Sequence, residues 1–140
     1  MKGHVNLVLV RNGEAIDQRS TSNLVVANGA VHIAKLLGSP GSVTPMGYIG
    51  IGIGFTAPAI TDFELVAERF RDSADTLQGG TGIQYTAAIE NDGDHGESIR
   101  EAGIFDSAAI DTGIMMARAT FSSIALAVGD VLLVEWNITI

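Results

Sequence analysis

The sequence contains no cysteine, little charge and few aromatic residues, and these shortages exclude several classes of protein. Without cysteine the chain cannot form structural disulfides or cysteine-based zinc sites, and nothing indicates an oxidising compartment. Charged residues make up 17% of the chain, below the usual quarter, so the surface has neutral ground to spare for partners. No apolar run approaches the ~20 residues that a membrane-spanning helix needs, so we expect no membrane partner.

Basic residues are the scarcer kind of charge. The chain has 8 Lys and Arg against 16 Asp and Glu, which gives a net charge of −8. Because nucleic-acid binding needs Lys and Arg to displace counterions from phosphates, we expect no nucleic-acid partner. The acidic balance suits solubility or docking on a basic protein surface. The N-terminal residues lack a signal-peptide layout, so we expect a protein made in a cytoplasm.

The remaining pattern is that of a β protein. A length of 140 residues suits one domain, and we expect a single β-structural domain over residues 1–140. Seven or eight short apolar runs separated by turn signals predict an antiparallel β-sandwich or jelly-roll-like fold. One short helix is predicted over residues 29–37, where apolar residues recur at helical spacing and Gly38 follows as a C-cap.

Residues 1–22 are predicted to form an N-terminal hairpin or arm. Asn12-Gly13 is the strongest two-residue hairpin signal, and charged residues flank it, which indicates a position near the surface. The apolar strand before the turn could add to the edge of a neighbour's sheet. The side chains expected to contact a partner there are Val5, Leu7 and Leu9.

Residues 48–54 alternate between apolar residues and glycine. One face of such a strand is bare, which allows another backbone or a bulky side chain to approach closely. Residues 52–57 also fit the loose dinucleotide fingerprint G-x-G-x-x-A. Pro58 follows them, however, and no helix begins there, so we interpret the segment as a glycine-faced strand.

Two further patterns bear on metals and catalysis. Residues 91–97 read NDGDHGE, and their oxygen donors make Asp92, Asp94 and Glu97 candidate cation ligands. Glycine at the third place departs from the EF-hand order, so we favour a solvated hairpin loop. The three histidines show no metal-ligand spacing, and no G-x-S-x-G elbow is present. We therefore expect neither a cofactor nor enzymatic activity.

Several residues on or beside predicted strands have two interpretations. Arg100 and Arg118 can form cross-strand ion pairs, or they can contact a partner, since arginine is enriched at interfaces. Trp136 on the last strand should face either the core or a subunit interface. The uncharged region around residues 47–58 is a further predicted contact surface. From it, Tyr48 and Phe55 complete the predicted partner interface.

The order of the blocks between residues 23 and 140 resembles a group of small virion proteins of tailed bacteriophages, often described as tail-fibre-like or structural. The most specific blocks are IREAGIF at residues 99–105 and WNITI at residues 136–140. The other blocks lie at residues 23–26, 29–37, 48–52, 56–58, 117–121 and 129–130. Residues 1–22 are not covered, and no catalytic residues come with the resemblance.

This resemblance implies a structural role in the virion, assembled in the host cytoplasm. Tail fibres normally need a long trimeric shaft and a receptor-binding tip, and this chain has neither. A small acidic β-domain is closer to a capsid decoration (cement) protein, which binds outside the shell and fastens neighbouring major capsid subunits. We expect the major capsid protein, or tail proteins, as partners, and self-association as a homodimer or homotrimer. A tail-fibre or baseplate component and a host-surface, carbohydrate-binding module are the alternatives.

Overall fold

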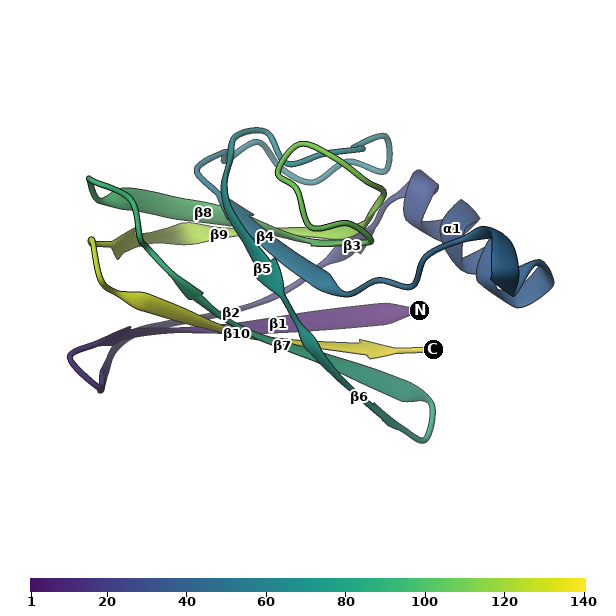
Figure 1. Cartoon of the computed structure of the whole chain (residues 1–140), viewed down its shortest axis with the longest axis horizontal. Coiled ribbons are helices and arrows are strands. Elements are labelled where there is room, and N and C mark those ends of the chain that lie inside the picture. The colour runs from purple at the N-terminus through teal and green to yellow at the C-terminus, as the bar shows by residue number, and fades with distance from the viewer.

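The protein, described here by a computed structural model of residues 1–140 apart from the side chain of Pro40, is a β-sandwich. Two antiparallel five-stranded sheets pack face to face, and a helix lies at one end (Figure 1). The predicted mainly β sandwich with one short helix is therefore confirmed. The elements are β1 (Lys2–Arg11), β2 (Glu14–Ser22), β3 (Leu24–Val25), α1 (Ala27–Gly38), the 3-10 turn η1 (Pro40–Ser42), β4 (Tyr48–Gly52), β5 (Glu68–Ser73), β6 (Asp75–Gly79), β7 (Gly82–Glu90), β8 (Glu97–Phe105), β9 (Met115–Leu126) and β10 (Val131–Thr139).

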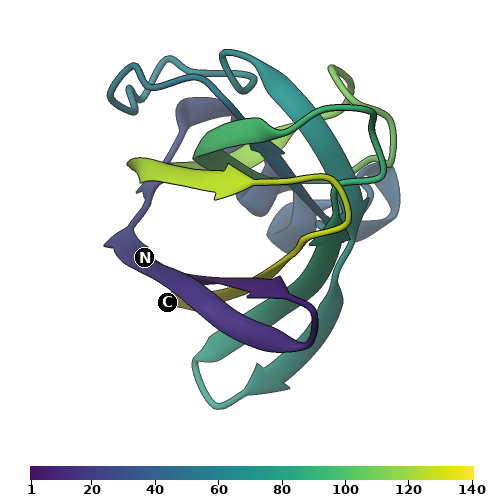
Figure 2. The same cartoon turned by 90° about the vertical axis from the view of Figure 1, so that its left-hand side faces the viewer.

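The two sheets draw their strands from different parts of the chain. Sheet A has the order β2-β1-β10-β7-β6, and sheet B has the order β3-β9-β8-β4-β5. Figure 2 shows the two layers from the side, with β1 and β10 neighbours in one layer and β8 and β9 neighbours in the other. Because the first and last strands pair along almost their whole length, the two termini lie side by side (Figure 1).

The core between the sheets follows from strict alternation along the strands. In a strand, successive side chains point to opposite faces, so every second residue of β1 and β10 reaches the same side. The central cluster buries those apolar residues together with Ile49 and Ile51 of β4. The alternating residues of β1 and β10 in this cluster are Val5, Leu7, Leu9, Leu132, Val134, Trp136 and Ile138.

The N-terminal hairpin is part of sheet A, and this corrects two expectations. Asn12 and Gly13 both have positive φ, as a two-residue hairpin turn requires. β1 lies between β10 and β2 rather than outside the sheet, so residues 1–22 are not a detachable arm. The partner contacts predicted for Val5, Leu7 and Leu9 are wrong, because their side chains are at most 2% exposed within this single chain.

The helix begins two residues before its predicted start and ends one residue after its predicted end, at Ala27 and Gly38. Gly29 allows it to lie directly on β9, since a Cβ at this position would stand 2.2 Å from the carbonyl oxygen of Met116. Buried residues of the helix are Gly29 and His32. Within the part of the chain that the structure describes, no helix has both the length and the apolar character that crossing a membrane requires.

Candidate functional site

The most distinctive surface feature is the loop of residues 53–67, which joins β4 to β5 and crosses the outer side of sheet B (Figure 1). Four large apolar side chains of this loop are exposed: Phe55 by 76%, Ile60 by 62%, Phe63 by 61% and Val66 by 58%. Single exposed apolar side chains are ordinary, whereas large contiguous apolar patches mark interaction sites, so four on one segment make it a candidate contact surface. We name residues 53–67 the apolar loop.

Glycines on the outer face of sheet B let the apolar loop approach closely. A Cβ on Gly52 would stand 2.4 Å from the carbonyl oxygen of Ala67, and one on Gly54 would stand 2.4 Å from Cβ of Val66. These distances are too short for any real side chain, so the backbone of Ala67 and the side chain of Val66 occupy the space that the two glycines leave. The close approach predicted from the alternation of apolar residues and glycine is confirmed.

A buried carboxylate holds both ends of the apolar loop. Oε1 of Glu101 accepts hydrogen bonds from the backbone N–H groups of Gly54 (3.0 Å) and Ala67 (2.8 Å), and Oε2 accepts one from Val66 (3.0 Å). Glu101 is 0% exposed, so these bonds form away from water. In such surroundings hydrogen bonds to an ionised acceptor are strong, which fixes the loop to β8.

Arg118 of β9 extends the same network to the middle of the loop. Its Nε and Nη2 donate to Oε2 of Glu101 at 3.1 and 3.0 Å, and its Nη1 donates to Oδ2 of Asp62 at 3.0 Å. Asp62 also accepts a hydrogen bond from the backbone N–H of Ala59. A buried cation thus bridges two acidic side chains, one from the sheet and one from the loop, and the apolar loop is braced along its length.

These contacts decide between the two interpretations of Arg118 and Trp136. Arg118 is 0% exposed and forms an ion pair across strands β8 and β9, so its predicted partner contact is wrong. Trp136 is also 0% exposed and faces the core, where its Nε1–H donates to Oδ1 of Asn23 at 2.7 Å. Its alternative placement at a subunit interface is likewise wrong, because the folded chain already encloses the indole ring.

Three of the predicted interface residues remain predictions. The guanidinium of Arg100 lies 5.5 Å from the ring centroid of Phe55, so both belong to the neighbourhood of the apolar loop. Tyr48 is half-buried and packs against a small cluster on the outer side of sheet B. That cluster consists of Val26, Leu65, Phe105 and Met115.

A second brace, absent from the sequence-based interpretation, holds the neighbouring loop of residues 106–114. Arg71 forms a bidentate pair with Glu68 at 2.7 Å, and its guanidinium carbon lies 3.6 Å from the centroid of the Phe105 ring. Its Nη1 also donates to the carbonyl oxygens of Ser107 and Thr112. In the sequence, the signal for this brace is the close spacing of the opposite charges of Glu68 and Arg71 in a chain with little charge. Only the fold shows that both side chains are buried.

The acidic loop between β7 and β8 does not bring its three candidate ligands together. Among the described residues, no group of three or more His, Cys, Asp or Glu side chains is arranged to hold a metal ion. The ring of His95 lies between Asp94 and Glu97, at 2.7 and 3.0 Å from their oxygens, while Asp92 is exposed. The hydrogen bond that the His95 ring donates to Asp94, followed by the negative charge of Glu97, raises the pKa of His95.

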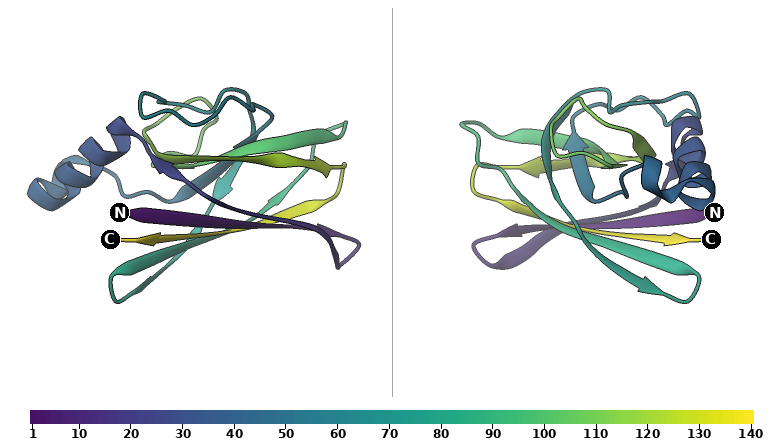
Figure 3. Two further views of the ribbon diagram at one scale, coloured as in Figure 1. Left: turned by 180° about the vertical axis from the view of Figure 1, so that it is seen from behind. Right: turned by 45° about the vertical axis from the view of Figure 1, so that its right-hand side comes forward.

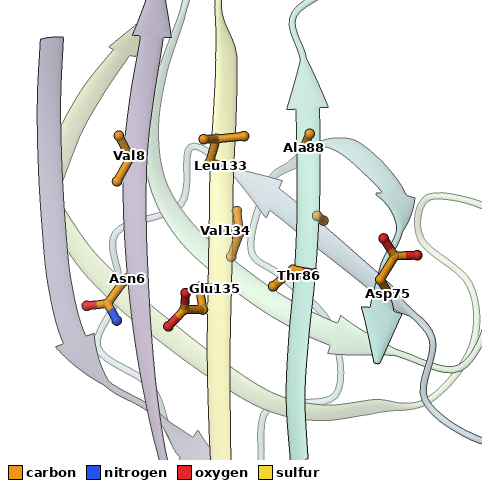
Figure 4. A pocket seen from close by; sticks show the side chains of 9 residues that line it. Asn6, Val8, Asp75, Thr86, Ala88, Leu133, Val134 and Glu135 are labelled. Atoms are coloured by element: carbon orange, nitrogen blue, oxygen red, sulfur yellow. The ribbon is translucent and has the colours of Figure 1, made fainter. Parts of the chain in front are cut away.

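The outer face of sheet A offers a different surface, with no element of the fold over it (Figures 1 and 2). Figure 4 shows a shallow hollow on this face, where outward side chains of neighbouring strands stand in rows. One row is polar and the next is apolar, with Leu133 of β10 43% exposed. The outward side chains that line the hollow are Asn6, Val8, Asp75, Thr86, Ala88, Leu133 and Glu135.

Comparisons of the chain with protein-family models, with curated proteins and with solved structures found no match.

Proposed function

We propose that this protein is a non-enzymatic structural protein of a tailed-bacteriophage virion, and specifically a capsid decoration protein. It binds the outside of the shell through the apolar loop and fastens neighbouring major capsid subunits. The observation that carries the proposal is the loop itself, which exposes Phe55, Ile60, Phe63 and Val66 while the buried Glu101 holds its backbone in place. The resemblance of residues 23–140 to phage virion proteins points to the same role.

A braced loop is suited to adhesion for an energetic reason. Binding costs free energy when flexible segments become ordered, and a loop that is already ordered avoids most of that cost. Exposed apolar side chains then contribute by leaving water when they meet a partner. A shell also presents the same contact many times, so a decoration protein that touches several subunits gains from high effective concentration.

The first test is the number of copies in purified particles, measured by quantitative gel or mass spectrometry against the major capsid protein. A count comparable to that of the capsid protein is the expected result. A handful of copies, or a small multiple of three or six, would replace the proposal with a tail-fibre or baseplate role. Absence from particles would overturn the virion role and favour the host-surface binding module.

The second test asks which surface makes the contact. The variant Phe55→Ala removes an exposed ring from the apolar loop, and Leu133→Ala removes an exposed side chain from sheet A. In a binding assay with shells that lack the protein, we expect Phe55→Ala to weaken binding tenfold or more, equivalent to about 1.4 kcal/mol. Leu133→Ala should bind as the unmodified chain does, and the reverse pattern would move the contact to sheet A.

A further inference from the structure

The outer edge of sheet A at β6 is open. β6 pairs with β7 on one side only, and all five of its residues are exposed, Leu77 by 68%. Within the described part of the chain, no backbone hydrogen bond joins residues 75–79 to anything except β7. Figure 3 shows the β6–β7 hairpin at the margin of the sandwich, away from the loops of sheet B, while Thr76 and Gln78 line a hollow shared with the helix. Such an edge is a template for pairing with another strand.

The opposite edge of sheet A, at β2, is guarded in ways that β6 is not. β2 contains Glu14, Asp17 and Arg19, whereas β6 has Asp75 as its one charged residue. The guanidinium of Arg19 donates to the carbonyl oxygens of Ser122 and Ser123 on β9, which ties β2 to the other sheet. The β1–β2 register is also irregular, between Leu9 and Val10. Charges and irregularities of this kind hinder edge-to-edge pairing, and β6 has only Asp75 and a regular register.

The hairpin register shows which groups the open edge presents. Gly79 and Gly82 flank a two-residue turn, so their pair is hydrogen-bonded, and hydrogen-bonded pairs then alternate along the strands. Leu77 therefore directs its N–H and C=O toward β7, whereas Thr76 and Gln78 direct theirs outward. The N–H of Ala74 follows the same alternation, since it points away from β7 and donates to the carbonyl oxygen of Gly47.

We propose that a second copy of this chain pairs with this edge, antiparallel, about a two-fold axis at Leu77. In this register Thr76 lies opposite Gln78 of the partner subunit, and every outward N–H and C=O of these residues finds an acceptor or a donor. Leu77 faces Leu77 of the partner subunit, and Asp75 faces Gly79 of the partner subunit. No like charges are opposed, so the edge is complementary to itself, as a two-fold interface requires.

No other antiparallel register satisfies the edge. If the strand of the partner subunit is shifted by one residue, the outward N–H and C=O groups of β6 face residues whose own N–H and C=O groups point toward β7. A shift of two in one direction places Thr76 opposite Gly80 of the partner subunit, which is not extended because its φ is +56°. The shift in the other direction requires the N–H of Ala74, which is already bonded to Gly47. The dimer carries two apolar loops. The proposal of a dimer does not depend on the capsid role.

Sedimentation equilibrium of the full chain tests the dimer, with one matched pair of variants. Proline at an outward edge position removes the outward N–H and leaves the inner ladder intact. We expect Gln78→Pro to raise the dimer dissociation constant at least tenfold. Gln18→Pro, at the equivalent outward position of β2, should leave it unchanged. A pairing of this small size predicts a weak dimer, so the measurement extends to high protein concentration. A chain that stays monomeric at all concentrations, or equal effects of both variants, would overturn the proposal.

A cross-link tests the register without depending on how proline is tolerated. The chain has no cysteine, so Leu77→Cys introduces a single thiol. Facing residues in a non-hydrogen-bonded pair have Cβ atoms about 4.5–5.5 Å apart, close enough for a disulfide after a small adjustment. Mild oxidation should convert Leu77→Cys to a covalent dimer and leave Gly79→Cys monomeric. Equal cross-linking of both variants, or none of Leu77→Cys, contradicts the two-fold axis.

Discussion

The outer faces of the two sheets are built from similar strands but meet opposite surroundings. The outer face of sheet B lies beneath the apolar loop, the loop of residues 106–114 and one end of the helix, whereas no element lies over the outer face of sheet A (Figure 3). Glu101 of β8 and Glu135 of β10 show the consequence. Glu101 is fully buried and accepts five hydrogen bonds, three of them from the loop backbone. Glu135 is exposed and accepts one from Asn137.

A polar residue on the outward side of a strand can therefore be solvated or buried, depending on what covers that face. On sheet A, outward polar side chains are solvated, and the strand alternates as an antiparallel strand with one wet face should. On sheet B the outward positions include glycines, which leave room, charged residues, which satisfy the backbone of the covering loop, and apolar side chains such as Phe105, which pack beneath it. The same alternation of residues along a strand therefore occurs in sheet A, whose outer face meets water, and in sheet B, which lies between sheet A and the covering loops.

The largest difference between the two faces is expected for the same substitution made on each. Glu101→Gln removes the buried carboxylate from Arg118, which keeps only its pair with Asp62, and turns an amide N–H₂ toward backbone donors. We expect a loss of about 3–5 kcal/mol in the free energy of unfolding. Glu135→Gln should change it by less than about 0.5 kcal/mol. Urea unfolding of both variants measures the difference, and equal losses would contradict the distinction between the two faces.

A pair of glycine substitutions tests the covering of sheet B independently of charge. Gly52→Ala places a methyl group against the carbonyl oxygen of Ala67, and we expect overpacking to cost about 1–3 kcal/mol. Gly79→Ala, on the edge of sheet A, meets nothing within 4 Å and should not destabilise the protein. Thermal unfolding followed by circular dichroism compares the two. A tolerated Gly52→Ala would show that the loop moves away easily.

An acid titration tests the half-exposed ion pair of sheet A, which joins Arg11 and Asp130, in contrast to the enclosed pair of sheet B. The hydrogen bonds from Arg11, aided by the N–H of Ala127, lower the pKa of Asp130. A lowered folded-state pKa gives stability that is present above the unfolded value of about 3.9 and is lost as pH falls through the folded value. Asp130→Asn should flatten the decline of the urea midpoint between about pH 5 and pH 2. Arg11→Gln should flatten it as well, since the guanidinium is the main cause. A slope unchanged in both variants would contradict this assignment.

The smallest effect on the free energy of unfolding is expected on the outer face of sheet A. Leu133→Thr replaces a 43% exposed side chain on sheet A with a smaller β-branched one. We expect a change of less than about 0.5 kcal/mol, because no layer packs on this side chain. Urea unfolding provides the measurement. A loss above 2 kcal/mol would mean that the face is covered in solution, for example by another copy of the chain.

Much of the fold could be predicted from local patterns. The alternation of apolar residues predicted the sandwich, Asn12-Gly13 predicted the first turn, and the run before Gly38 predicted the helix to within two residues. These features depend on residues close to one another in the chain. The apolar loop could not be found in this way, because Phe63 and Val66 stand among charged residues with no regular period.

The failed interface predictions have one physical cause. The charged residues that flank the Asn12-Gly13 turn indicate a hairpin near the surface, and for this reason its apolar strand is predicted to contact a partner through Val5, Leu7 and Leu9. Its pairing with β10, however, joins residues more than a hundred positions away. Arg118 was undecided because an ion pair and an interface arginine have the same local signature. Burial of both Arg118 and Glu101 depends on where residues 53–67 lie, and no short stretch of sequence encodes that.

By itself, the sequence determined which residues are apolar, where strands turn and which side of each strand could enter a core, because these are properties of neighbours along the chain. Only the tertiary structure decided which outward faces are covered, which charges are buried and which sheet edge is left open. Those outcomes follow from pairings between distant segments. They separate Glu101 from Glu135, two glutamates on outward positions of strands that differ in what surrounds them.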